Sequence, residues 1–437
     1  MSTSEFVPPG LTKEQTRRSL VTFNWNLVFR AVFETVCGGP TFIFVAFALS
    51  LGIAEEKIGV VASAVSWACI VQMLGLPVVS RMRDRKKSIL VLGLLEPMLM
   101  MAGVAVVPWL APGWRLAVLT GAVFTAAASL NMSRPLTEDW LATVLPAGLR
   151  GRYLGRRFQY LSGVMIATTL IVGWVADELG RDNTVGLGYL LTVGGLFGVL
   201  SVLVLRRATM PGAAVTPPQV RFIDLVGVLR TREFRRFLAG VLLYNLPFFV
   251  PVPFYQVFNL ETLEMSKRRI AYMMAGYFAI KIVTLQFWRL HADRLGPRRM
   301  LALVGPSYVG FFGLMAVASA QRPWPAFAAW WIAALGDGAY LLATQMTLYR
   351  VVPVQAPRPA YFAVSNLITF AAFGVGALVA VPILQAMGDV SVEIGPLTLG
   401  RFHLLFAASA ALMIPCLMSA VFFPGPDRGK ALANQVP

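Results

Sequence analysis

The residues best placed to do chemistry are ionisable side chains that lie inside long apolar stretches of the sequence. Arg30 and Glu34 interrupt one such stretch, and Lys281 and Asp337 interrupt two others. A charged group inside a bilayer is costly, so by default it marks an ion pair, a substrate pathway or a coupling site. This pattern indicates binding and proton exchange rather than covalent catalysis.

The spacing of these residues suggests how they meet. Arg30 and Glu34 are four residues apart and share one helix face, whereas Asp337 is flanked by two glycines that we expect to leave room for water and substrate. Counting about 1.5 Å per residue places Arg30, Glu34, Lys281 and Asp337 near mid-membrane. We expect Glu34 or Asp337 to carry a coupling proton, with Asp337 favoured, and Lys281 or Arg30 to meet the substrate. Ion pairs that only neutralise one another are the alternative.

A proline-rich segment adds to this candidate site. Pro247, Pro251 and Pro253 cannot sit in an unbroken helix, because each removes a backbone hydrogen bond and clashes one turn back. We therefore expect a hinge or a binding wall there, the alternative being a kinked packing helix. The candidate substrate and coupling residues are Asn26, Arg30, Glu34, Arg134, Tyr244, Asn245, Lys281 and Asp337.

The composition indicates which elements must hold these residues. The chain of 437 residues is 57% hydrophobic and only 14% charged, outside the range of soluble domains. Its apolar residues fall into twelve blocks, each long enough to cross a bilayer as a helix. The blocks lie at 20–50, 58–80, 88–109, 116–143, 158–178, 184–205, 236–258, 270–290, 300–319, 325–348, 361–386 and 402–423. We predict an all-α polytopic membrane protein, which excludes a soluble enzyme, a disulfide scaffold and a disordered chain.

The basic residues predict the orientation. With the N-terminus inside, 26 of the 38 Lys and Arg residues fall in cytoplasmic segments and eight in external ones. Such a bias places both termini in the cytoplasm and explains the net charge of +17 without a nucleic-acid partner. We expect a multi-pass protein of the bacterial inner membrane.

Internal repetition divides the chain. A polar segment, 207–234, separates six blocks from six, so we expect bundles at 1–206 and 235–437 joined by a cytoplasmic linker. Basic loops at 80–86 and 293–299 repeat at nearly the spacing that relates 146–153 to 353–361. Equivalent loops lie on the same side, which is typical of a parallel repeat.

These loops resemble those of the major facilitator superfamily, the transporters with six plus six helices. Segment 292–299 reads Ala-Asp-Arg-Leu-Gly-Pro-Arg-Arg and is similar to the family's loop motif, although Arg289 stands where the family usually has Gly. The first copy departs further, with Ser80 and Arg83 in place of the Asp and Gly. The resemblance implies that Asp293 braces a cytoplasmic gate together with Arg294 and Arg298. It also implies that Arg150 belongs to the turn between the fourth and fifth helices.

The resemblance implies a secondary active transporter that moves a small polar or anionic solute by alternating access, coupled to protons. An exporter of the drug type remains an alternative, although 163–173 lacks the Gly-Pro-rich pattern common in such exporters. A non-transporting scaffold would have no reason to keep opposed charges at mid-membrane. No nucleophile–base pair, metal cluster or phosphate-binding loop is present in the sequence, so we expect neither an enzyme nor a cofactor. The expected partners are a small-molecule substrate, a co-transported proton and the lipid bilayer, and we expect a monomer.

Overall fold

The computed structural model describes residues 11–71, 84–145, 150–180, 183–210, 226–352, 358–388, 390–394 and 397–423. Within these ranges, eleven helices are long and apolar enough to cross a membrane. The remaining expected span, 58–80, is described only as far as residue 71 and begins with α3 (Ile58–Trp67). The expected helical membrane fold is therefore confirmed.

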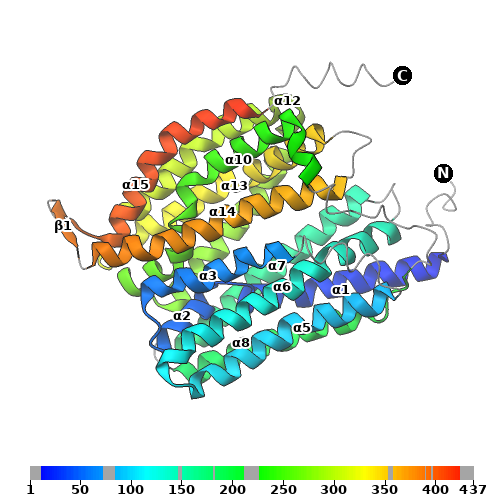
Figure 1. The fold of residues 1–437 in the computed structure, drawn as a ribbon, viewed down its shortest axis with the longest axis horizontal. Coiled ribbons are helices and arrows are strands. Elements are labelled where there is room, and N and C mark those ends of the chain that lie inside the picture. Colours follow the sequence, from blue (N-terminus) through cyan, green and yellow to red (C-terminus); the bar gives the residue numbers. More distant parts are fainter. Residues whose placement is uncertain are drawn as a thin grey trace. The chain divides into compact units, whose positions relative to one another are not determined.

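The helices form two compact units; Figure 1 colours most of the first from blue to blue-green and most of the second from green to red. Unit 1 comprises Met1–Ile53 and Ala64–Arg221, and unit 2 comprises Ala54–Ser63 and Phe222–Pro437. The helices of unit 1 are α1 (Lys13–Cys37), α2 (Phe42–Ser50), α5 (Arg85–Val106), α6 (Pro112–Val144), α7 (Arg150–Glu178) and α8 (Thr184–Leu205), with a 3₁₀ turn, η3 (Val107–Trp109).

The first apolar stretch, 20–50, does not form a single helix. The helix begins before the stretch does, and a break in the middle divides it into α1 and α2. Thr12 and Gln15 form a capping box that starts α1 at Lys13, seven residues before the apolar residues begin. The helix then stops at Gly38, and Gly39 has φ of +123°, a conformation that residues other than glycine rarely adopt. Thr41 caps the new helix α2 by accepting a hydrogen bond from the backbone N–H of Phe44.

Glycine lets three helices of unit 1 approach closely. Helix α8 packs against both α1 and α5. A Cβ atom on Gly198 of α8 would lie 2.7 Å from Phe33 of α1 and 2.7 Å from Pro97 of α5. Only a residue without a side chain fits there, so this contact fixes the spacing and rotation of α1 relative to α5.

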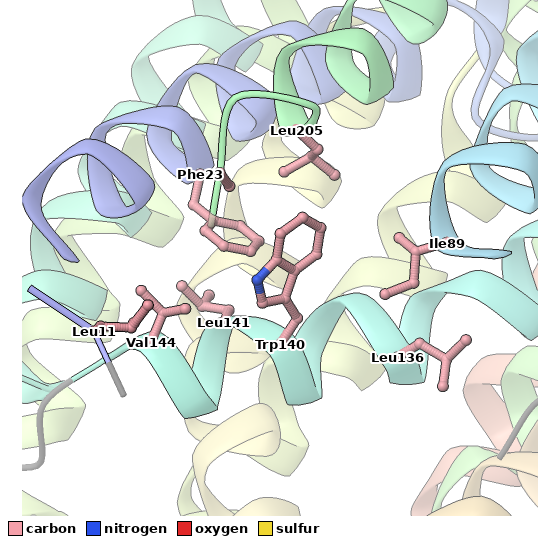
Figure 2. Packing of buried hydrophobic residues seen from close by; sticks show 9 residues of the cluster. Leu11, Phe23, Ile89, Leu136, Trp140, Leu141, Val144 and Leu205 are labelled. Atoms are coloured by element: carbon pink, nitrogen blue, oxygen red, sulfur yellow. The ribbon is translucent and has the colours of Figure 1, made fainter. Parts of the chain in front are cut away.

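Trp140 of α6 organises the end of unit 1 where the chain leaves α8. Its ring packs edge-on against Phe23 at 5.3 Å and lies among buried aliphatic side chains such as Leu205 (Figure 2). Its indole N–H donates to the carbonyl of Thr209. Lys86 donates to the carbonyls of Arg206 and Ala208, which neutralises the negative end of α8.

Unit 2 contains α10 (Arg232–Phe249), α11 (Tyr255–Val257), α12 (Lys267–Val317), α13 (Trp324–Val351), α14 (Arg358–Met387) and α15 (Arg401–Cys416). It also contains 3₁₀ turns at η2 (Glu55–Lys57), η5 (Val228–Arg230), η6 (Val252–Phe254) and η8 (Leu417–Phe422), and a π-helical turn, η7 (Phe258–Thr262). Helix α12 is two membrane spans, because Gly296 has φ of +70° and breaks it. A hairpin that the sequence analysis did not predict, β1 (Ser391–Ile394) with β2 (Leu397–Gly400), is antiparallel and projects beyond the ends of α14 and α15 (Figure 1).

The prolines after Tyr244 break the helix as predicted. Helix α10 ends at Phe249, and the chain continues through a 3₁₀ turn and a π turn. The helical partner of the Phe249 carbonyl would be Pro253, which has no N–H. Gly376 of α14 approaches this carbonyl so closely that a Cβ atom there would lie 2.4 Å from the oxygen. Irregular backbone at membrane depth is thus covered by another helix.

The close approach of α8 to α1 and α5 yields a first prediction. Gly198→Ala should destabilise the protein by about 1–3 kcal/mol, because the new methyl group overpacks the contact with Phe33 and Pro97. Gly121→Ala on α6 is the matched control, since nothing lies within 4 Å of the added atom. Thermal unfolding in detergent measures both variants, and equal melting temperatures would contradict the assigned role of Gly198.

Candidate functional site

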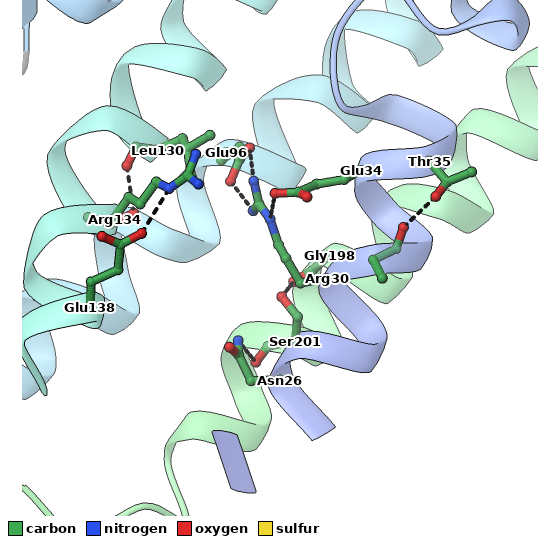
Figure 3. A network of polar contacts seen from close by, with 12 residues as sticks. Asn26, Arg30, Glu34, Thr35, Glu96, Leu130, Arg134, Glu138, Gly198 and Ser201 are labelled. Atoms are coloured by element: carbon green, nitrogen blue, oxygen red, sulfur yellow. Dashed lines mark hydrogen bonds and ion pairs between the residues drawn. The ribbon is translucent and has the colours of Figure 1, made fainter. Parts of the chain in front are cut away.

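Arg30 is the centre of an ion-pair cluster in unit 1 (Figure 3). Its two terminal nitrogens bind the two carboxylate oxygens of Glu96 on α5, one of them at 2.8 Å. Its Nε donates to Glu34 at 2.9 Å, as the four-residue spacing predicts. The guanidinium group therefore holds two carboxylates, one from its own helix and one from a neighbouring helix. We call Arg30, Glu34 and Glu96 the triad.

The members of the triad differ in exposure. The Glu96 side chain is 7% exposed and Arg30 16%, whereas Glu34 is 40% exposed. The guanidinium group also lies 4.9 Å from the ring centroid of Phe33, which adds a cation–π contact. Glu96 and Arg30 form a buried bidentate pair, and Glu34 is the more exposed of the two carboxylates.

Asn26 and Arg134 do not join the triad by any hydrogen bond or ion pair in the part of the chain that is described. Asn26 is buried and donates to the backbone carbonyl of Ser201 on α8, so it ties α1 to α8. Arg134 pairs with Glu138 one turn along α6 at 3.1 Å, and both side chains are more than 60% exposed. Figure 3 shows this pair as a separate group.

Asp337 of α13 gathers three partners within unit 2. Lys281 of α12 lies 3.4 Å from Oδ2, and the hydroxyl of Tyr277 donates to the same oxygen. The hydroxyl of Tyr308 donates to Oδ1 at 2.9 Å. One cation and two hydroxyl donors thus bind one carboxylate, and the Asp337 side chain is 28% exposed. Lys281, Asp337, Tyr277 and Tyr308 form what we call the aspartate cluster.

The glycines on either side of Asp337 do not leave the room that was expected. A Cβ atom on Gly336 would lie 2.6 Å from the hydroxyl of Ser307, and one on Gly338 would lie 3.2 Å from the Cα of Leu285. Both glycines instead let α13 pack closely against α12. The expectation that they make space for water and substrate was wrong.

Tyr244 and Asn245 lie beside the aspartate cluster. Tyr244 stacks on Tyr340 with ring centroids 5.4 Å apart and meets Tyr308 edge-on at 6.1 Å. Asn245 hydrogen-bonds the hydroxyl of Tyr340 and the backbone carbonyl of Val241. Both side chains are buried, so in this conformation they belong to an aromatic wall next to Tyr308.

The candidate gating residues are described only in part. The side chains of Asp293 and Arg150 lie outside the described residues, as does the first motif copy before residue 84. Arg294 and Arg298 are exposed and flank the break at Gly296. Close to Arg150, the hydroxyl of Tyr153 donates to the carbonyl of Leu20, and burial raises the pKa of Tyr153 to about 12, which keeps it protonated.

Sequence reasoning left three of these contact residues out of the candidate set. For Glu96, the available signal was an ionisable residue inside the apolar block 88–109. Tyr277 lies four residues before Lys281, and this helical spacing was the available signal. Tyr308 carried no local signal, because its contact with Asp337 depends on how the two halves of α12 pack on α13.

Comparison with known proteins supports a transporter fold. The family described as MFS/sugar transport protein matches residues 156–425. Among curated proteins, no sequence matches the chain. A crystal structure of a mutant of the nucleoside transporter NupG matches with a TM-score of 0.70 at 9% identity, covering 93% of this chain and 99% of that chain.

Two further solved structures are similar. The D-xylose-proton symporter matches with a TM-score of 0.66 at 13% identity, covering 93% of this chain and 98% of that chain. A bacterial homologue of the iron transporter ferroportin, in an inward-facing state, matches with a TM-score of 0.64 at 12% identity, covering 93% and 98%. At such identities the likeness shows the fold, which is twelve helices in two bundles.

The partners of Asp337 yield a second prediction. Lys281→Met should destabilise the protein by about 1.5–3 kcal/mol, because it leaves a largely buried carboxylate without its cation. Arg134→Met is the comparison, since it removes an exposed pair that contributes under about 1 kcal/mol. Thermal unfolding in detergent would measure both changes. Equal losses would mean that Lys281 does not stabilise Asp337.

Proposed function

Because the chain belongs to the MFS/sugar transport protein family, we propose that it is a secondary active transporter that moves a small polar solute across the membrane, driven by a proton gradient. The observation that carries the proposal is the pairing of opposed charges inside the spans of both units. These are the triad in unit 1 and the aspartate cluster in unit 2. Ionisable groups at that depth are expensive to keep, and secondary transporters use them for binding and coupling.

The substrate is a small solute with hydroxyl or other polar groups. The aspartate cluster offers a carboxylate, an ammonium and two hydroxyls beside aromatic rings, a combination suited to a polar ring-shaped molecule. Two of the similar structures are those of a nucleoside transporter and a D-xylose-proton symporter. We therefore place Lys281 and Asp337 in the substrate site, with Tyr244 and Asn245 forming its wall.

Coupling needs a carboxylate that binds a proton on one side of the membrane and releases it on the other. Glu34 and Asp337 are the two partly exposed carboxylates of the clusters, at 40% and 28%. Each has a cation within 3.4 Å whose distance or pairing can change during transport. We assign the proton to one of these two groups.

Alternating access requires gates, and the loop between the two spans of α12 supplies a candidate. Asp293 precedes the second span, Arg294–Val317, so its carboxylate suits the positive end of that helix. The excess of basic residues supports placing this loop and both termini in the cytoplasm. There Asp293, Arg294, Arg298 and Arg150 would hold the inner gate closed.

The proposed function is tested in proteoliposomes. Wild-type protein should exchange labelled substrate in counterflow, screened first across nucleosides, pentoses and hexoses, and should accumulate that substrate when a pH gradient is imposed. Glu34→Gln and Asp337→Asn are measured beside it, and at least one should lose accumulation. Accumulation that survives in both variants would remove these carboxylates from coupling. Counterflow that no gradient drives would indicate a uniporter, and no counterflow at all would favour a scaffold.

The gate yields a separate prediction. Asp293→Asn should slow counterflow of that substrate while leaving the melting temperature within a few degrees of wild type, because the change removes one charge from a loop outside the spans. Glu14→Gln, which loses only an exposed pair with Arg17, is the matched control. Normal transport by Asp293→Asn at equal expression would show that Asp293 takes no part in gating.

A further inference from the structure

We infer that the triad holds one exchangeable proton, that this proton enters and leaves through Glu34, and that Glu96 is the positioning residue that makes the proton necessary. The inference rests on the proposed proton-coupled function and assigns that role between Glu34 and Asp337. It follows from the charges and contacts of the two clusters.

The charges of the triad do not balance when all three groups are ionised. Arg30 contributes one positive charge, whereas Glu34 and Glu96 contribute one negative charge each. A surplus negative charge in a region of low dielectric constant is costly, and binding one proton removes it. The two carboxylates share this proton as one coupled site rather than titrating independently.

Among the described side chains of the helices packed around the triad, the one further cation that acts on it is Arg134 of α6. Helices α2 and α8, which pack against α1, carry no charged residue within their bounds, and α5 and α7 carry their other charged residues near their ends. Arg134 makes no hydrogen bond to the triad; its exposed side chain is paired with Glu138 at 3.1 Å. The thiol of Cys37, three residues after Glu34 on α1, is buried and donates to the carbonyl of Leu191.

The geometry indicates where the proton passes. Glu96 accepts two charge-assisted hydrogen bonds from Arg30 and is 7% exposed, so solvent hardly reaches it. Glu34 accepts one bond from Arg30 and is 40% exposed. Protonation forms an O–H bond on the Glu34 carboxylate with a proton from water. It weakens one bond to Nε and leaves the bidentate pair intact.

The aspartate cluster needs no such proton. The charges of Lys281 and Asp337 sum to zero. The hydroxyl of Tyr277 donates to one oxygen of the carboxylate and that of Tyr308 to the other. An ionised Asp337 is therefore stabilised by a cation and two donors. The contacts assign proton exchange to unit 1 and leave the aspartate cluster to the substrate.

Replacing either carboxylate of the triad should have the same consequence. In Glu34→Gln the remaining pair is Arg30 with Glu96, and in Glu96→Gln it is Arg30 with Glu34. Each pair is neutral without a proton. Infrared difference spectroscopy of the purified protein, recorded as the pH is changed, should show the C=O stretching band of a protonated carboxyl group in wild type. That band should be lost in both variants.

Three further variants are controls for the spectrum. Asp337→Asn and Glu14→Gln should keep the band, because neither touches the triad. Arg30→Lys should also keep it, because lysine preserves the single positive charge and hence the surplus. Three results would overturn the inference. The band could persist in Glu96→Gln or Glu34→Gln, it could be lost only in Asp337→Asn, or it could be absent from wild type. If Glu96→Gln does not purify, Glu34→Gln alone decides.

Transport separates coupling from a merely structural role. Glu96→Gln should retain counterflow but lose the accumulation driven by a pH gradient, although Glu96 itself is nearly inaccessible. Loss of counterflow and accumulation together, in a protein that keeps its melting temperature, would contradict the positioning role. If the band behaves as expected while a pH gradient drives no transport in wild type, the proton site stands and the proposed proton coupling fails.

Discussion

The constraint on which this structure depends is the cost of an unpaired charge inside an apolar helix bundle. Arg30 cannot remain there without counter-charges, and its two partners come from different helices. The second partner is reachable only because Gly198 lets α1 and α5 converge on α8. A packing contact between apolar surfaces thus determines the electrostatics of the triad, because without it Glu96 would be an isolated buried carboxylate.

The two units meet this constraint with different chemistry. The guanidinium of Arg30 is a planar fork, so it binds Glu96 with two nitrogens and still presents Nε to Glu34. The ammonium of Lys281 is a compact charge that approaches one oxygen of Asp337, and Tyr308 serves the other. The first arrangement accommodates a surplus carboxylate. The second surrounds a single carboxylate with an ammonium group and two hydroxyl donors.

Features that depend on residues close together in the sequence could be predicted, whereas contacts that depend on how helices pack could not. Hydropathy located the spans, helical spacing predicted the Arg30–Glu34 pair, and the prolines predicted the broken α10. The bond from Arg30 to Glu96 was not predictable, because it depends on helix rotations that glycine contacts set. The same holds for the glycines beside Asp337, which serve helix packing, and for the hairpin β1–β2, whose residues lie between apolar blocks.

The irregular backbone of unit 2 lies where bending of α10 would affect the aspartate cluster. Helix α10 ends where its prolines leave carbonyls without helical partners, so its bend costs less to alter there than in a regular helix. Tyr244 lies on this helix and contacts the ring of Tyr308, whose hydroxyl binds Asp337. Phe248 of the same helix also meets the ring of Tyr308 edge-on, so a change of bend at Pro247 acts on the aspartate cluster through these aromatic contacts. In unit 1 the triad sits on helices that pack closely at Gly198, so its three charges are held together. In the proposed function, substrate binding and proton exchange would then have separate mechanical supports, as the coupling of two events across a membrane requires.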